Sequence, residues 1–457
     1  MRTTLQSDII IAGGGIAGIV AALEALRAGK SVTIVDKDSQ ERLGGLALWA
    51  FGGMALVGTP LQARLKIPDT PERALADWLR FGQLGEDHHW PRAWARYYVE
   101  HSRSEVYDWL TSHGLTFMPA INWVERGMNG DGNSLPRYHM VWGTSRLLVQ
   151  TLIAAMRAAD SGGRLKVLHR HRIESIDHAG GAVAGALAID EETGAETRIA
   201  APIVVLAMGG INGSHEQVRA NWSKSRLMPS AMLNGAHPYA DGKLHRLAAQ
   251  RLGAQITHAG EMWNYAAGFP HPFPHFPGHG LSAVPAKSAL WLNHRGERIG
   301  PQPLVTGFDT HVLCQRVAEQ EKPWTWHLLN WRIAVREFAI SGAEHNLRVR
   351  DQQKLMFLKE TLLGNHRFIR QLQAESPHFL VDETLAGLAA KMNALTGTRD
   401  VTAATLQATA DAFDSNFANG AKLQNDDQIR RILPARQWPP DRLRTCKPAP
   451  LQKAGAG

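Results

Sequence analysis

Residues 7–18 read SDIIIAGGGIAG, an apolar run rich in β-branched residues that leads into a glycine turn. The stretch that follows, IVAALEAL (19–26), has the composition of a helix. Strand, G-x-G-x-x-G turn and helix in this order open a dinucleotide-binding βαβ unit, in which the helix N-terminus faces the phosphates. Gly13 permits the turn, Gly15 lets the backbone approach a pyrophosphate, and Gly18 lets the helix pack against the strand. The expected contacts with the pyrophosphate are Gly13, Gly14, Gly15, Ile16, Ala17 and Gly18.

A second strand and an acidic residue complete this unit. Residues 31–35 read SVTIV and end on Asp36, about twenty residues after the glycines. A carboxylate at that position accepts hydrogen bonds from ribose hydroxyls and disfavours a 2′-phosphate. The pattern therefore predicts FAD or NAD in preference to NADP, with Asp36 and the adjacent Lys37 beside the adenosine.

Three further glycine pairs follow in apolar surroundings. Gly44-Gly45 and Gly52-Gly53 lie eight residues apart among aromatic side chains. This is typical of backbone that lies close to a flat ligand, although two ordinary loop turns would give the same pattern. The third pair, Gly209-Gly210, ends the buried strand predicted over residues 201–208. A turn of this kind returns to the nucleotide at the carboxyl end of the sheet.

Length and composition predict a large core. The chain has 457 residues, of which 44% are hydrophobic, and this is enough for two domains. It has no uninterrupted apolar run of about eighteen residues, so no membrane span is expected. The residues before the first strand are too few for a signal peptide. Two cysteines, Cys314 and Cys446, provide no disulfide framework, which predicts a cytoplasmic protein.

The positive charge is concentrated at the C-terminal end. From Gln428 onward, seven lysines and arginines face one acid, so this stretch carries +6 of the formal net charge of +8. The main body is therefore nearly balanced. Because no basic-aromatic pattern of a nucleic-acid module occurs elsewhere, no nucleic-acid partner is expected.

The order of the first turn, Asp36, Gly44-Gly45 and the segment AMGG (207–210) resembles the flavoprotein subunit family of fumarate reductase and succinate dehydrogenase. Within that family, the chain is most similar to the branch of 3-ketosteroid dehydrogenases and related FAD-binding dehydrogenases. The resemblance covers about residues 8–428. The motifs that carry it in this branch are WAFGG (49–53), PRYH (136–139), WGT (142–144), FAISG (338–342) and MNALTG (392–397).

The resemblance implies an α/β fold and FAD as the cofactor. A Rossmann-like FAD-binding domain of the glutathione-reductase type is expected over residues 1–231, with an inserted α+β substrate or cap domain over 232–417. Leu46 stands where succinate dehydrogenases carry a histidine that bonds to the flavin, which implies non-covalent FAD. Beyond the first turn and Asp36, the implied cofactor contacts are Gly44, Gly45, Leu46, Ala47, Gly52, Gly53, Ile173, Ala207, Gly209 and Gly210.

The resemblance also leads us to expect a departure near the C-terminus. Relatives return to the FAD domain after the cap through a segment of the form GLYAAGE, which this sequence does not contain. The residues after Gln428 are instead rich in proline and arginine and show no periodicity. We therefore expect the chain to be truncated or frame-shifted there, with residues 418–457 disordered or loosely attached.

Three residues are candidates for contact with substrate or for proton transfer: Tyr265, His279 and Arg298. Each has a simpler interpretation, as a packed tyrosine, a loop histidine and a solvated arginine. His279 belongs to the stretch FPHPFPHFPGHG (269–280), in which three histidines are spaced four residues apart. The prolines prevent one helical face and no carboxylate or thiol is close in sequence, so no metal site is expected. A rigid aromatic cap loop is favoured instead.

The predicted activity is that of an FAD-dependent oxidoreductase that acts on a CH–CH or similar bond of a small organic substrate. In such chemistry hydride passes between a substrate carbon and flavin N5 while a cap residue moves a proton. Residues 299–302, IGPQ, replace the motif that precedes the catalytic arginine of fumarate reductases, which disfavours a dicarboxylate. The electron acceptor is left open. The alternatives are a catalytically inactive FAD-domain fragment, a dinucleotide-binding protein, or an NAD-dependent oxidoreductase.

Overall fold

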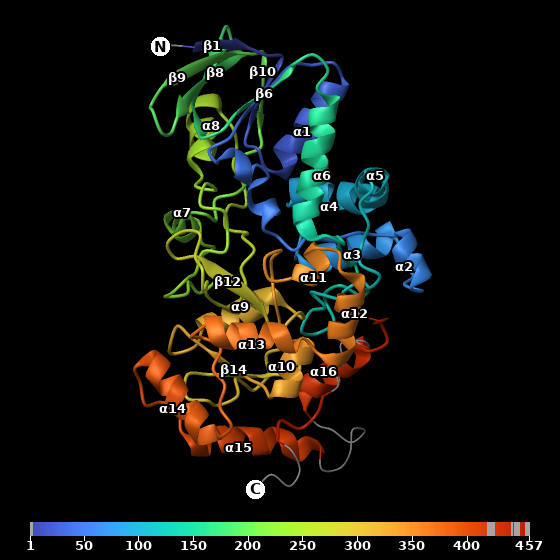
Figure 1. The fold of residues 1–457 in the computed structure, drawn as a ribbon, viewed down its shortest axis with the longest axis vertical. Coiled ribbons are helices and arrows are strands. Elements are labelled where there is room, and N and C mark those ends of the chain that lie inside the picture. The colour runs from blue at the N-terminus through green and yellow to red at the C-terminus, as the bar shows by residue number, and fades with distance from the viewer. Residues whose placement is uncertain (1–2, 418–425, 440–441, 443–447, 453–457) are drawn as a thin grey trace.

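The computed structural model describes residues 3–417, 426–439, 442 and 448–452 (Figure 1). A four-stranded parallel sheet with the order β10-β2-β3-β6 forms the centre of the N-terminal half. Its short strands are rich in β-branched residues, and β3 is buried over its whole length, as expected for a sheet covered on both faces. The strands are β2 (Ile9–Ala12), β3 (Val32–Val35), β6 (Leu165–Leu168) and β10 (Ile203–Leu206).

Two layers cover this sheet. The helices α1 (Ile16–Arg27) and α6 (Thr144–Ala159) run side by side on one face, where Ile19, Leu23 and Val149 are completely buried. A second sheet packs on the other face through residues such as Ala186 and Ile199. Its order is β1-β9-β8-β7, with β1 (Thr3–Gln6), β7 (His171–Ala179), β8 (Ala182–Asp190) and β9 (Glu196–Ala200). The βαβ unit predicted from the sequence is thus confirmed, and β7, β8 and β9 pair as antiparallel neighbours beside it.

A helical region extends from the edge of this domain. Thr70 caps the helix that begins at Pro71, because its hydroxyl accepts a hydrogen bond from the Arg73 N–H. The chain then continues from α4 through a π-helical turn at 102–108 into α5. The elements are the short helices η1 (Gln40–Arg42) and η2 (Gly45–Leu48), α2 (Pro60–Arg64), α3 (Pro71–Phe81), α4 (His89–His101), α5 (Trp109–Ser112) and the antiparallel pair of β4 (Gly53–Ala55) and β5 (Tyr138–Met140).

The C-terminal half contains small sheets surrounded by helices, most of which lie toward the opposite end of the molecule from α1, whereas α8 (Lys243–Leu252) lies at the same end as α1 (Figure 1). Its strands form β11-β12-β15 and the pair β13-β14. The strands are β11 (Gly268–Pro270), β12 (Gly280–Val284), β13 (Leu290–Leu292), β14 (Trp326–Leu328) and β15 (Ala339–Ile340). The helices are α7 (His215–Ala220), α8 (Lys243–Leu252), α9 (Thr310–Ala318), α10 (Trp331–Glu337), α11 (Leu347–Arg350), α12 (Lys354–Leu363), α13 (His366–Glu375), α14 (Leu385–Thr396), α15 (Ala403–Asp414), the single turn η4 (Ser415–Phe417) and α16 (Asp427–Ala435).

Helix α16 corrects the expectation that the whole segment 418–457 is loosely attached. Ile429 and Ile432 are buried on one side of this helix, and the buried Gln428 amide donates hydrogen bonds to two backbone carbonyls, at 2.7 Å and 2.8 Å. The i, i+3 spacing of two isoleucines gives this basic segment an apolar side that packs on the core. Residues 418–425, 440–441, 443–447 and 453–457 lie outside the described residues. The domain boundaries at 231 and 417 stay predictions.

None of the described helices is long and apolar enough to cross a lipid bilayer. The free thiol of Cys314 is partly buried, and burial raises its pKa to about 12. A protonated thiol of this kind is a poor nucleophile near pH 7.

We predict that Arg137→Met destabilises the protein by about 3–5 kcal/mol, because it leaves two buried carboxylates unpaired. The Arg137 guanidinium, 4% exposed, contacts Asp69 at 2.8 Å and Asp77 at 2.7 Å. The control Arg198→Met removes an exposed ion pair with Asp177, which is worth at most about 1 kcal/mol. Urea unfolding of both variants measures the difference. Equal losses of stability would contradict a structural role for the buried pair.

We also predict a stability loss at acidic pH that depends on His139. Burial lowers the pKa of this side chain to about 4, while Nδ1 donates to the Arg137 carbonyl (2.7 Å) and Nε2 accepts from Thr59 (2.8 Å). Because the unfolded chain binds the proton near pH 6.5, stability falls as the pH drops from about 6.5 to 4, by up to about 3 kcal/mol. His139→Gln should remove this part of the slope. If the free energy of unfolding falls equally from pH 8 to pH 5 in the wild-type protein and in His139→Gln, the prediction is refuted.

Candidate cofactor and active site

The first glycine turn is held together by backbone contacts that leave no space for side chains. A Cβ on Gly18 would lie 2.0 Å from the Gly13 carbonyl oxygen, and a Cβ on Gly13 would lie 2.4 Å from the Ala207 oxygen. Gly13 also has a φ of +110°, which disfavours any other residue. The turn after β2, the start of α1 and the end of β10 therefore meet at one point. This confirms that the predicted glycines of the turn and Ala207 come together.

The N-terminus of α1 is open toward one side. No described atom lies within 4 Å of the place where a Cβ of Gly15 would be. Gly15 is the N-cap of α1, and among the described residues no side chain caps its first turn. The N–H groups there are available to an anion. The side chains of Ile16 and Ala17, which follow in the first turn, are exposed on the helix surface.

Asp36 supports this turn directly. The Gly14 N–H donates to Asp36 Oδ2 at 2.5 Å, and the Asp38 N–H donates to Asp36 Oδ1 at 2.8 Å. Each carboxylate oxygen keeps a second lone pair for a ribose hydroxyl. Lys37 lies differently from the expectation, because its ammonium group pairs with Asp241 at 2.8 Å, just before α8. Its side chain therefore ties the FAD-domain strand to the later part of the chain.

Gly44 and Gly45 lie beside the first turn. The Gly44 N–H donates to the Gly14 carbonyl at 2.9 Å, and a Cβ on Gly45 would lie 3.8 Å from Gly15 Cα. Leu46 continues this surface and is 44% exposed, while Ala47 is partly buried. At the end of β10, Gly209 and Gly210 also face open space, since no described atom is within 4 Å of either Cβ position.

Gly52 and Gly53 lack side chains because other parts of the protein, and not a ligand, occupy the space beside them. A Cβ on Gly52 would lie 2.6 Å from the Ser145 nitrogen, and a Cβ on Gly53 would lie 2.0 Å from the Tyr138 ring. These two glycines thus fit the interpretation of a structural turn, here at the start of β4, where it pairs with β5. Ile173, the expected adenine contact, lies in β7, where it pairs with Ala188 next to the parallel sheet.

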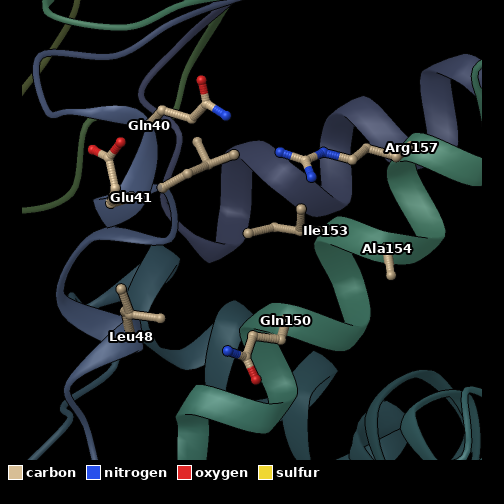
Figure 2. A pocket seen from close by; sticks show the side chains of 8 residues that line it. Gln40, Glu41, Leu48, Gln150, Ile153, Ala154 and Arg157 are labelled. Atoms are coloured by element: carbon tan, nitrogen blue, oxygen red, sulfur yellow. The ribbon is translucent and has the colours of Figure 1, made fainter.

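A small surface pocket of about 280 Å³ lies close to this region, between η1, η2 and α6 (Figure 2). None of the predicted cofactor contacts lines it, so it is distinct from the cradle around Gly15. Its lining residues are Gln40, Glu41, Leu43, Leu48, Gln150, Ile153, Ala154 and Arg157.

The residues around Gly15 fit FAD. A long anionic dinucleotide needs backbone that it can approach, free N–H groups for the pyrophosphate and a ribose acceptor. The open positions at Gly15, Gly45, Gly209 and Gly210 supply the first, the start of α1 supplies the second and Asp36 supplies the third.

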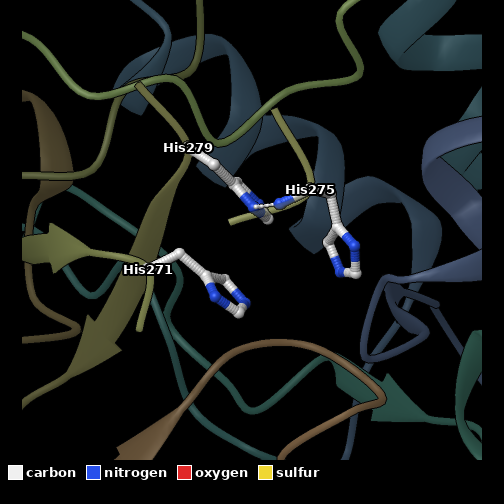
Figure 3. Close-up of side chains that lie close together, drawn as sticks. All are labelled: His271, His275 and His279. Atoms are coloured by element: carbon white, nitrogen blue, oxygen red, sulfur yellow. Dashed lines mark hydrogen bonds between the residues drawn. The ribbon is translucent and has the colours of Figure 1, made fainter. Parts of the chain in front are cut away.

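Trp49 connects this cradle to a cluster of histidines. Its indole lies between the rings of His237 and His275, each with a centroid distance of 5.2 Å and nearly parallel. Its carbonyl accepts the Ala343 N–H at 2.8 Å, which brings in the loop after β15. We define the histidine cluster as His271, His275, His279, Glu344 and His345; Figure 3 shows its first three histidines.

The three predicted catalytic residues are not brought together. His279 lies in the histidine cluster, stacked on His271 at 4.4 Å. Tyr265 is 53% exposed and stacks on Trp263. Arg298 forms an ion pair with Asp426, the N-cap of α16, and this helix lies at the end of the molecule opposite to α1. The structure thus gives Arg298 a structural role, because its charge is neutralised there.

The sequence did not identify Glu344 and His345. Glu344 accepts a hydrogen bond from His275, which lies 69 residues earlier in the chain. Only the pairing of β12 with β15 brings the two loops together. No local signal predicts this, because a carboxylate beside three histidines is visible only in space.

Comparison with known proteins identifies the family. The family model described as "FAD binding domain" matches residues 8–455. A KsdD-like steroid dehydrogenase of Mycolicibacterium smegmatis is 36% identical, over 99% of this chain and 85% of the relative. A KsdD-like steroid dehydrogenase of Mycobacterium tuberculosis is 34% identical, over 99% and 82%.

Two solved structures share the fold. The 3-ketosteroid Δ1-dehydrogenase of Sterolibacterium denitrificans has a TM-score of 0.61 at 16% identity, over 92% of this chain and 81% of that chain. The 3-ketosteroid Δ4-(5α)-dehydrogenase of Rhodococcus jostii has a TM-score of 0.57 at 19% identity, over 93% and 80%. Because the family model and the relatives match nearly the whole sequence, and the glycine cradle fits the cofactor, the chain belongs to the FAD-binding domain family and is an FAD-dependent oxidoreductase.

Proposed function

We infer that this protein dehydrogenates or reduces a CH–CH bond next to a carbonyl group in a flat, apolar substrate of the steroid type. The observation that carries the proposal is the 34–36% identity with KsdD-like steroid dehydrogenases over 99% of the chain. FAD, when bound, supplies the acceptor or donor of the hydride. The chain's own residues bind the cofactor, orient the substrate, exclude water and move the proton.

The cofactor is bound without a covalent bond in this proposal. Leu46, which stands at the position of the flavin-linked histidine in succinate dehydrogenases, has no nucleophilic atom. The arrangement of α1 and α6, the parallel sheet and the β7–β9 layer supports a domain of the glutathione-reductase type. The later residues, from about 232 to 417, act as the substrate cap.

The loops of the cap fit an apolar substrate. Trp263 and Phe273 are more than half exposed and Tyr265 lies beside Trp263, although large aromatic side chains are normally buried. Phe273 lies between two members of the histidine cluster in sequence, and the cluster contacts Trp49 next to the cradle. A flat ring system that covers these side chains would remove apolar area from water, at about 25 cal/mol per Å².

Gly15→Ala is predicted to reduce the FAD affinity at least tenfold while the protein stays folded. The new methyl group has space in the protein, since φ is −72° and no atom lies within 4 Å, but it would occupy the cofactor cradle. Gly18→Ala should instead disrupt folding, because its Cβ meets the Gly13 oxygen. Gly235→Ala is the control, because a Cβ there would make only ordinary contacts, at 3.9 Å and 4.0 Å, outside the cradle. Flavin released on denaturation and thermal unfolding measure both effects. Full FAD content in Gly15→Ala would refute the cradle.

The substrate class can be tested with a steroid and a dicarboxylate. A reduced 3-ketosteroid, mixed anaerobically with the FAD-loaded protein, should bleach the flavin absorbance and yield a steroid with one more C=C bond. Succinate, as the dicarboxylate control, should leave the spectrum unchanged. If the flavin is present and neither steroids nor their unsaturated products bind or react, the steroid-type substrate is wrong. A non-redox dinucleotide-binding protein would bind FAD but would neither oxidise the reduced steroid nor reduce its unsaturated product.

A further inference from the structure

One side-chain pair in the histidine cluster has the arrangement of a base held by a carboxylate. His275 Nε2 lies 3.0 Å and 3.2 Å from the two carboxylate oxygens of Glu344. A carboxylate only accepts hydrogen bonds, so the proton of the neutral ring is held on Nε2 and Nδ1 is the basic nitrogen. Among the described residues, no hydrogen bond is formed to His275 Nδ1. The ring is 29% exposed and so is open to a ligand.

Two neighbouring histidines, His271 and His279, also carry their proton on Nε2, but their Nδ1 atoms are already hydrogen-bonded. The Phe273 N–H donates to His271 Nδ1 at 2.9 Å, and the His275 N–H donates to His279 Nδ1 at 3.3 Å. Burial lowers the pKa of His271 to about 4 and also lowers the pKa of His279. Both rings are therefore neutral near pH 7, with the proton on Nε2. In both rings Nδ1 already accepts a backbone N–H, whereas Nδ1 of His275 accepts no hydrogen bond from a described residue.

This hydrogen bonding also decides against a metal ion. Ring nitrogens of His271, His275 and His279 lie within 4.8 Å of one another, a spacing that a cation could use. A metal-bound histidine, however, presents a bare nitrogen to the ion and donates its other N–H to an acceptor. In His271 and His279 the bare nitrogen already accepts a backbone N–H. Binding a metal would break those hydrogen bonds or leave two N–H groups facing each other.

We propose that His275, positioned by Glu344, is the catalytic acid–base group that removes and returns the substrate proton. This inference rests on the proposed function, since it assumes a substrate with a carbonyl group. Trp49 provides the link to the cofactor: its indole stacks on His275, and it directly follows the η2 turn that begins next to Gly15. The base therefore lies between the cap and the cradle, where substrate and cofactor meet.

The proton step balances without any further reactant. The C–H bond next to the carbonyl breaks, its proton goes to His275 Nδ1, and its electron pair moves into the enolate of the substrate. His275 is then a cation paired with Glu344, which stabilises it in the way that the acid of a catalytic triad stabilises its histidine. In the dehydrogenation direction, bound FAD would supply the acceptor for the hydride of the adjacent carbon.

Hydrogen exchange tests this step apart from overall turnover. We expect the FAD-loaded protein in D2O to introduce deuterium next to the carbonyl of 4-androstene-3,17-dione, as measured by mass spectrometry. His275→Ala should lower the exchange rate at least 100-fold, and added imidazole should restore part of it. Glu344→Gln should lower the rate about tenfold. His378→Ala, an exposed histidine elsewhere in the cap, is the control.

The outcomes separate the two proposals. Exchange by His275→Ala at the wild-type rate overturns the role of His275, while unimpaired steroid turnover leaves the proposed function standing. If the steroid neither binds nor exchanges with the wild-type protein, the proposed function fails. In that case, nitrogen NMR of the holoenzyme still decides the arrangement: a proton on Nε2 of His275, partly lost in Glu344→Gln, supports it. A proton on Nδ1 of His275, or stoichiometric retention of added Zn²⁺, overturns it.

Discussion

The rest of the molecule depends on the contact of three backbone segments at the first glycine turn. The turn after β2, the first turn of α1 and the end of β10 approach so closely that Gly13 and Gly18 tolerate no Cβ. This approach packs α1 against the parallel sheet and leaves Gly15 as the open position of the same turn. One steric constraint therefore sets both the core of the domain and the place of the cofactor.

Much of the cofactor site could be predicted from the sequence because its signals are local. Strand, turn and helix follow one another within residues 9–27, and a glycine that must lack a Cβ is visible as a glycine. Gly52 and Gly53 show the limit of this reasoning. They too must be glycines, but the atoms that a Cβ would meet belong to Ser145 and Tyr138 of the protein and not to a ligand. The sequence does not tell whether a close neighbour is protein or ligand.

The substrate side could not be predicted, because its contacts join residues far apart in the chain. Arg298 had the residue type of an anion-binding group, yet Asp426, more than a hundred residues later, neutralises it. Trp326 lies in the strand β14, where it pairs with Leu292 of β13, more than thirty residues earlier in the chain. The basic C-terminal composition likewise masked the buried side of α16, since only Ile429 and Ile432 are needed to anchor one short helix.

The histidine cluster shows how residue type alone misjudges a site. Three histidines at equal spacing suggested a metal and were rejected for want of a nearby acid, but the acid is present as Glu344. What distinguishes the chemistry is the direction of each hydrogen bond. Backbone N–H groups donate to Nδ1 of His271 and His279, whereas Glu344 accepts a hydrogen bond from Nε2 of His275 and so leaves Nδ1 of His275 without a proton. Nδ1 of His275 is therefore the nitrogen that we propose takes the substrate proton.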